Sequence, residues 1–198
     1  MKKPNDPFRA WGFGKEYPWM DLANTLEWNG FGQLTDHLKN PEWLALYLRR
    51  WNFGRLPSQV PIRQLKQLRT ALRRLAAKIS AGTALSSRDI ALLNSKMNVP
   101  LNQKLVHRQN GWKLEIVPVR GDWSWIFSRI VASLGEMLAL GTNQRLKYCP
   151  NQGCRWIFFD QTKGGTRRWC NDRTCGNRDR VRRSRRQHKK SGTRKNNG

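Results

Sequence analysis

The chain has 198 residues, of which 38% are hydrophobic, enough for one domain with a modest core and a small additional module. Its net charge is +25, and residues 145–198 contribute +14 of it, with seventeen Lys and Arg against three acids. This asymmetry predicts a polyanionic partner, most often nucleic acid. A membrane partner is disfavoured, because the basic tail lacks an apolar face and no stretch approaches the roughly 18 apolar residues of a membrane span.

The first 18 residues are rich in proline, glycine and aromatic side chains, which predicts an irregular arm packed on the body. The chain begins Met1-Lys2-Lys3-Pro4, and no apolar run typical of a secretion signal follows. We therefore expect a reducing, cytoplasmic location, associated with the nucleoid if the protein binds DNA.

A short helix is predicted over Asp21–Trp28. Asp21, Asn24 and Thr25 cluster on this segment. They are expected either to line a small-molecule effector pocket or to form a structural polar cluster that bonds the neighbouring backbone.

Three longer helices follow, each with a recognisable start. Residues 40–51 begin with an Asn N-cap, a proline at the first helical position and an acid facing the helix dipole. Residues 61–82 repeat apolar side chains at intervals of three and four, and their basic opposite face is either solvated or an auxiliary phosphate contact. Residues 86–97 begin with a sequence that resembles a capping box.

The period then changes to that of strands. Residues 105–109 and 112–117 flank Asn110-Gly111, a pair that favours the type I′ turn of a hairpin. A last helix is expected over residues 122–140, capped by its first residue. The predicted fold class is α+β: a mainly helical N-terminal domain with one β-hairpin, followed by a small C-terminal module that contains all four cysteines of the chain.

Nothing in the sequence indicates catalysis. The three histidines are far apart and lack ligand spacing. No glycine-rich phosphate loop, Ser-His-Asp arrangement or paired-carboxylate motif is present. We expect a binding protein rather than an enzyme.

All cysteines of the chain lie in one short stretch, as two C-x4-C pairs separated by fifteen residues: Cys149, Cys154, Cys170 and Cys175. Four soft ligands with this spacing suit one structural, tetrahedral Zn²⁺ ion, and two disulfides or bare thiols are the alternatives. Between the pairs, residues 156–159 and 166–169 are expected to form a hairpin that turns at residues 163–165. A hairpin of this size is marginal without a metal.

These residues resemble a known family. Cys175-Gly176-Asn177-Arg178, preceded by Cys149-Pro150 and Phe158-Phe159-Asp160, resembles the CGNR zinc finger. Residues 20–25 are similar to the Leu-Asp-Phe-x-Asn-Thr stretch of the ABATE domain, that finger's usual N-terminal partner. The resemblance implies a stress-induced transcription regulator. It divides the chain into an ABATE-like domain (1–143), a CGNR-type finger (144–187) and a basic disordered tail (188–198).

Arginines beside the finger and after its last cysteine are the candidate nucleic-acid-binding residues: Arg167, Arg168, Arg178, Arg180, Arg182, Arg183, Arg185 and Arg186. Arginine neutralises phosphate and can bind a guanine edge, so double-stranded DNA is the expected partner, with Arg178–Arg183 nearest the bases. An RNA- or ribosome-associated protein and a zinc-stabilised protein-interaction module are the alternatives. Gly176 is expected to let the backbone approach a zinc-bound sulfur, and Asn177 to bond the finger backbone.

Overall fold

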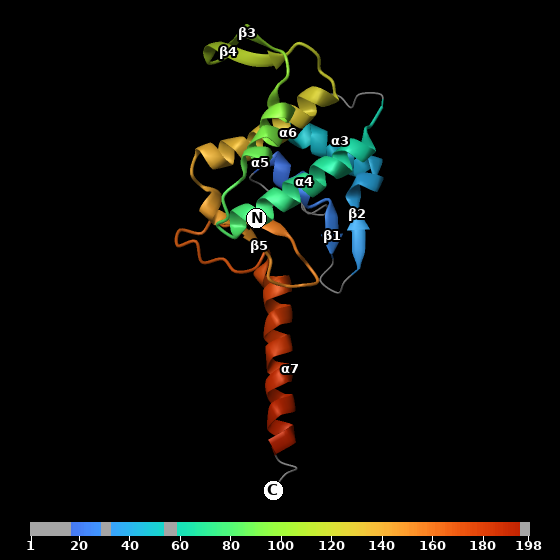
Figure 1. Ribbon diagram of the computed structural model, residues 1–198, viewed down its shortest axis with the longest axis vertical. Helices are drawn as coiled ribbons and strands as arrows, with labels where there is room; N and C mark the ends of the chain where they lie inside the picture. The colour runs from blue at the N-terminus through green and yellow to red at the C-terminus, as the bar shows by residue number, and fades with distance from the viewer. Residues whose placement is uncertain (1–16, 29–32, 54–58, 195–198) are drawn as a thin grey trace.

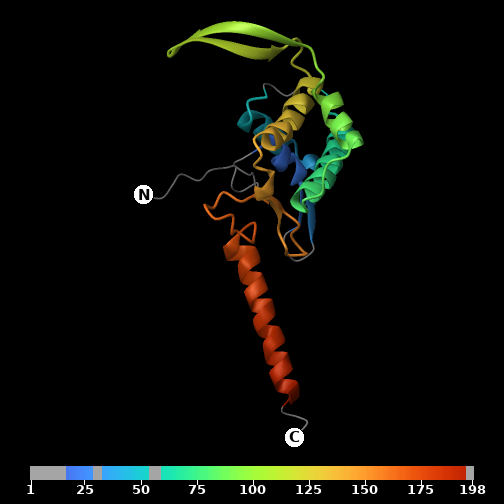
Figure 2. The same cartoon turned by 60° about the vertical axis from the view of Figure 1, so that its left-hand side comes forward.

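The structure, a computed structural model, describes residues 17–28, 33–53 and 59–194, so most of the predicted N-terminal arm lies outside the described residues. Figures 1 and 2 show a helical body in the middle. A β-hairpin projects from one end of it, and a long C-terminal helix projects from the other. No described helix combines the length and the apolar character needed to cross a bilayer.

Within the described residues, the helices of the body are α2 (Pro18–Ala23), α3 (Pro41–Arg50), α4 (Ile62–Ser80), α5 (Ser87–Met97) and α6 (Trp123–Ala139). Helix α2 lies against both α4 and α6, and α5 packs along α6. The core between them contains fully buried large side chains, among them Trp19, Leu65, Leu72, Ile130 and Leu134. Short 3-10 turns occur at His37–Lys39 and Asn143–Arg145.

Local caps explain where the long helices begin, and they confirm the predicted starts. The side chain of Asn40 accepts from the backbone N–H groups of Glu42 and Trp43. Ser86 and Asp89 form a reciprocal capping box at the start of α5. Asp122 accepts from two N–H groups in the first turn of α6. Each cap satisfies amide donors that the helix itself leaves unpaired.

The predicted helix over residues 21–28 is wrong in its second half. Helix α2 ends at Ala23, and β1 (Leu26–Trp28) pairs antiparallel with β2 (Leu34–Asp36), a hairpin that the sequence pattern did not predict. The physical reason is local and tertiary bonding: the Thr25 hydroxyl donates back to the carbonyl of Leu22, and Asn24 is bound to the finger. These hydrogen bonds take the place of those that a longer helix would form.

The predicted hairpin of the body is present, as β3 (Leu101–Arg108) and β4 (Gly111–Pro118), but its turn differs. Arg108 pairs with Gly111, so the turn residues are Gln109 and Asn110. Neither has a positive φ, and the left-handed conformation falls on Gly111 at 103°. The prediction of a type I′ turn is therefore wrong, because that turn needs a positive φ at both central residues. Here the one positive φ belongs to Gly111, the residue after the turn.

The strand pairing predicted for the finger is also wrong. β6 (Ile157–Phe159) pairs antiparallel with β5 (Leu146–Tyr148), which precedes the first cysteine. Residues 166–169 form no strand. A π-helical turn (Asp172–Gly176) follows and leads into α7 (Asn177–Arg194). Helix α7 thus continues past residue 188, where the disordered tail was expected to begin.

Candidate metal centre and basic helix

The four cysteines converge from three places in the finger. Cys149 follows β5, and Cys154 lies in the loop before β6. Cys170 precedes the π-helical turn, and Cys175 lies within it. All four Sγ atoms lie within 4.8 Å of one another, with Cys154 and Cys170 3.6 Å apart and Cys170 and Cys175 3.7 Å apart. A tetrahedral Zn²⁺ ion with bonds of about 2.3 Å separates its sulfurs by roughly 3.8 Å, whereas a disulfide needs about 2.05 Å. The cluster fits zinc.

The ionisation of the thiols also fits a cation. Hydrogen bonds from Cys154 and Cys170 lower the pKa of Cys149 to about 2. The bond to Cys149 raises the pKa of Cys154 to about 12, and the pKa of Cys170 is raised further still for the same reason. Thiolates this close together repel one another, and a bound cation offsets that repulsion. The four cysteines form the zinc-binding site, and their four sulfurs suffice for a tetrahedral coordination shell.

Two asparagines shape the loops that present the sulfurs, and sequence reasoning missed both. Asn151 accepts from the backbone of Gly153 through its side chain and from Cys154 through its carbonyl. Asn171 accepts from the N–H groups of Arg173 and Thr174 through its side chain, and its carbonyl accepts from Cys175. The available signal was an Asn one or two residues after the first cysteine of each pair.

A buried carboxylate organises the loop between the cysteine pairs. Asp160 is fully buried and accepts from Lys147 Nζ at 2.7 Å, from the Thr162 hydroxyl at 2.6 Å and from the Arg167 N–H at 2.8 Å. Burial opposes its ionisation, but these hydrogen bonds, led by Lys147, hold the pKa of Asp160 well below its ordinary value. They also explain why residues 160–168 form an ordered loop in place of the predicted strand.

Gly176 lies close to two side chains of the finger. A Cβ atom there would lie 2.4 Å from the carboxylate Oδ1 of Asp172 and 3.1 Å from Cδ1 of Trp169, so a larger residue would force these groups to shift. The expected approach of its backbone to a zinc-bound sulfur stays a prediction. Asn177 is exposed, and it is its backbone N–H that bonds the carbonyls of Asp172 and Thr174.

The two arginines predicted beside the finger behave differently. Arg167 donates from Nε to the carbonyl of Trp169 and from a terminal nitrogen to that of Cys170, and its guanidinium lies 4.8 Å from the Phe158 ring centre. These contacts engage it inside the finger rather than leaving it for a ligand. Arg168 is exposed and stacks over Trp169 at 5.2 Å.

Along α7, acids engage some of the predicted arginines. Arg180 pairs with Asp172 at 3.1 Å. Asp179 pairs with both Arg182 and Arg183 at 2.9 Å. Arg178 is half-buried in the first turn of α7, and Arg185 and Arg186 are exposed about two turns further along.

The three residues of the predicted polar cluster are buried and hydrogen-bonded. Asp21 accepts from Trp51 Nε1 at 2.8 Å. Thr25 accepts from Arg69 at 3.1 Å, and Asn24 binds the backbone of Ile157. These bonds favour the structural alternative over an effector pocket at this position.

A closed four-cysteine site set against a helical body defines the chain as a zinc-finger protein. A family model described as "CGNR zinc finger" matches residues 145–188. The model of the ABATE family, described as "Putative stress-induced transcription regulator", matches residues 16–139, which is more than half of the chain. The chain belongs to the ABATE family and carries a C-terminal CGNR zinc finger. No curated protein matches it.

Proposed function

We propose that the chain is a DNA-binding transcription regulator, not an enzyme, that acts in the cytoplasm at the nucleoid. The observation that carries this proposal is α7, an 18-residue helix that begins directly after the last cysteine and extends away from the body (Figure 1). It contains nine Arg and Lys residues and a single acid, Asp179. The description of the ABATE family supports a regulatory role.

The geometry of α7 suits the major groove of a DNA duplex. Eighteen residues span about 27 Å at 1.5 Å per residue. The major groove of B-DNA is about 12 Å wide and admits a helix, whereas the deep, narrow major groove of duplex RNA does not. Arg178, Arg182 and Arg185 recur at intervals of four and three, so they share one face of the helix.

The ion pairs on α7 change which arginines should matter most. Arg180, Arg182 and Arg183 already neutralise Asp172 or Asp179. The exposed pair between Arg180 and Asp172 is worth about 0–1 kcal/mol, so a phosphate can displace the acid, although part of the gain is offset. Asp179 is buried, so its pairs with Arg182 and Arg183 are harder for a phosphate to displace. Arg185 and Arg186 have no acidic partner among the described residues, and we therefore expect them to contribute more than the arginines nearer the finger.

The test is a titration of the zinc-loaded protein against labelled DNA and RNA duplexes of equal length at matched salt. Replacing Arg185 and Arg186 with alanine should weaken DNA binding and reduce the salt slope by about two, one for each lost phosphate contact. The matched control replaces Arg88 and Arg120, two exposed arginines of the body, because it changes the net charge equally.

Three outcomes would contradict the proposal. Equal losses from both double variants would mean that binding follows net charge and not α7. Tighter binding to RNA than to DNA would favour an RNA-associated protein. Absence of binding to either duplex would leave the finger as a protein-interaction module.

A further inference from the structure

The β3–β4 hairpin has one apolar face. In its register, Leu105 pairs with Leu114 and Gln103 with Ile116, and directly paired residues lie on the same side of an antiparallel ribbon. Five large apolar side chains of this face are 47–71% exposed: Leu101, Leu105, Trp112, Leu114 and Ile116. They make up half of the exposed large hydrophobic residues in the part of the chain that the structure describes.

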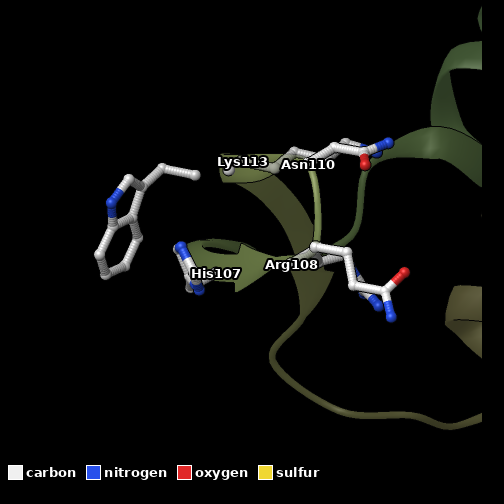
Figure 3. Close-up of a pocket in the computed structure, with 7 residues that line it drawn as sticks. His107, Arg108, Asn110 and Lys113 are labelled. Carbon is white, nitrogen blue, oxygen red and sulfur yellow. The ribbon is translucent and has the colours of Figure 1, made fainter.

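The opposite face is mainly polar. By the alternation of the strands it carries Asn102, Lys104, Arg108, Lys113 and Glu115, together with two half-buried valines, Val106 and Val117. Arg108 donates to Glu115 at 2.8 Å on this side. Figure 3 shows residues that line the hollow at the tip of the hairpin, His107 and Arg108 among them. As consecutive residues of β3, these two lie on opposite faces of the strand. The fixed charges of the hairpin therefore lie off the apolar face.

An apolar face of this size is unusual without a partner. The hairpin projects away from the helices in both views (Figures 1 and 2), and an isolated two-stranded hairpin is only marginally stable in water. Its five side chains form an exposed apolar patch on the order of 500 Å², at the upper end of what the largest patch of a monomeric protein covers. Contiguous exposed patches above a few hundred Å² commonly mark interaction sites.

We propose that this face binds the same face of a second copy of the chain, forming a twofold dimer. The exposed patch supplies more than half of the roughly 800 Å² that each partner buries in a standard interface. The face carries no fixed charge, so neither nucleic acid nor an acidic peptide complements it. If the twofold axis passes through the centre of the face and runs perpendicular to the strands, Trp112 at the tip of one hairpin lies over Leu101 at the base of the other.

The charge distribution also favours this arrangement. Two chains of net charge +25 repel each other, but residues 145–198 contribute +14 of that charge, and their helix α7 projects from the end of the molecule opposite the hairpin (Figure 1). Pairing through β3–β4 keeps the two α7 helices far apart, so the repulsion between them is screened beyond a Debye length of about 8 Å. No other end of the molecule offers this combination of apolar surface and distance from α7 within the described residues.

Sedimentation equilibrium of the zinc-loaded full chain, from about 1 to 100 µM, tests the proposal. One chain has a mass of 23.2 kDa, and the mass measured for the wild-type protein should be twice that value. Leu105→Glu places a carboxylate in the centre of the face and should raise the dimer dissociation constant by about 100-fold or more. Asn102→Glu is the matched control, because it adds the same charge to the same strand on the opposite face. It should remain dimeric.

A second variant guards against local misfolding of the strand. Trp112→Lys, a change next to the turn, should also raise the dimer dissociation constant by at least about tenfold. The far-UV circular dichroism spectrum should stay unchanged. A wild-type protein that is monomeric throughout would overturn the proposal, as would equal dimerisation of Leu105→Glu and Asn102→Glu. If deletion of residues 1–16 converted a monomer into a dimer, that segment and not a second copy would be the native occupant, and the proposal would likewise fail.

Discussion

The side-chain amide of Asn24 makes both backbone hydrogen bonds of Ile157, donating from Nδ2 to its carbonyl at 2.8 Å and accepting at Oδ1 from its N–H at 2.9 Å. Both residues are buried, although 133 positions separate them in the sequence. The Asn24 side chain thus makes the two hydrogen bonds that a neighbouring strand would otherwise make with Ile157 in β6. Arg73 adds a second bridge, because its guanidinium donates to the carbonyls of Ala23 and Arg155 at 2.9 Å.

This contact joins the finger to the body as one packed unit. Leu146 and Ile157, from the two strands of the finger, belong to the same buried cluster as the helices of the body. The zinc site and Trp169 form a separate, smaller cluster beside it. Loss of the finger's structure would therefore remove part of the main core.

The first prediction concerns Asn24. Asn24→Ala should lower the free energy of unfolding by about 1–3 kcal/mol for each group of Ile157 left unpaired. Urea denaturation of the zinc-loaded protein measures the loss. Asn24→Asp, which keeps the acceptor but lacks the donor, should also destabilise, and Asn94→Ala at an exposed helical position is the control. Stability equal to wild type in Asn24→Ala would contradict the role assigned to this amide.

The second prediction concerns zinc. Native mass spectrometry should find one zinc ion per chain, and chelation should lower the thermal midpoint of the whole chain by roughly 10 °C. Exposure of Leu146 and Ile157 costs about 1.5–3 kcal/mol each, and each kcal/mol shifts the midpoint of a domain this size by about 2–4 °C. Cys170→Ser should already show the lower midpoint and respond no further to the chelator. A midpoint of the body unaffected by zinc would mean that the finger is an independent unit.

The third prediction is a pH dependence of the body. Hydrogen bonds from Lys78, Arg74 and Ser86 hold the pKa of Asp89 well below its ordinary value. A carboxylate whose pKa is lowered by folding stabilises the protein above its unfolded pKa of about 3.9, and that contribution is lost as the pH falls below it. Asp89→Asn should therefore lower the thermal midpoint at pH 7, and the difference from wild type should shrink below about pH 4.

The matched control for this prediction is Asp122→Asn. Asp122 is an exposed N-cap, and asparagine caps a helix about as well as aspartate. The thermal midpoint of Asp122→Asn should therefore follow that of the wild type at every pH. A difference between Asp89→Asn and wild type that stays constant down to pH 2 would show that packing, and not ionisation, is responsible.

The fourth prediction rests on the proposed function and concerns Asp179. Asp179→Asn removes the acid that pairs with Arg182 and Arg183, so both become available to phosphate. Affinity for a DNA duplex should rise, and the salt slope should increase by about one to two. Glu136→Gln, an exposed acid of α6, makes the same charge change on the body and should alter affinity far less. Equal gains in the two variants would mean that only net charge matters.

Sequence alone determined the features that depend on residues a few positions apart. The caps at Asn40, Ser86 and Asp122 predicted where α3, α5 and α6 begin, because a cap bonds amides two or three residues away. The two cysteine pairs predicted the zinc site for a similar reason. Zinc fixes the number and type of its ligands so narrowly that four cysteines in one short stretch leave few alternatives.

Tertiary structure alone decided which distant partners meet. β6 pairs with β5 rather than with residues 166–169, because Asp160 binds the backbone of the intervening loop and Asn24 occupies the other edge of Ile157. The same holds for the arginines, since Arg167 is engaged inside the finger while Arg185 is exposed. A polar side chain shows its type in the sequence, but its partner is chosen by which buried groups would otherwise be left without a hydrogen bond, and that depends on the whole fold.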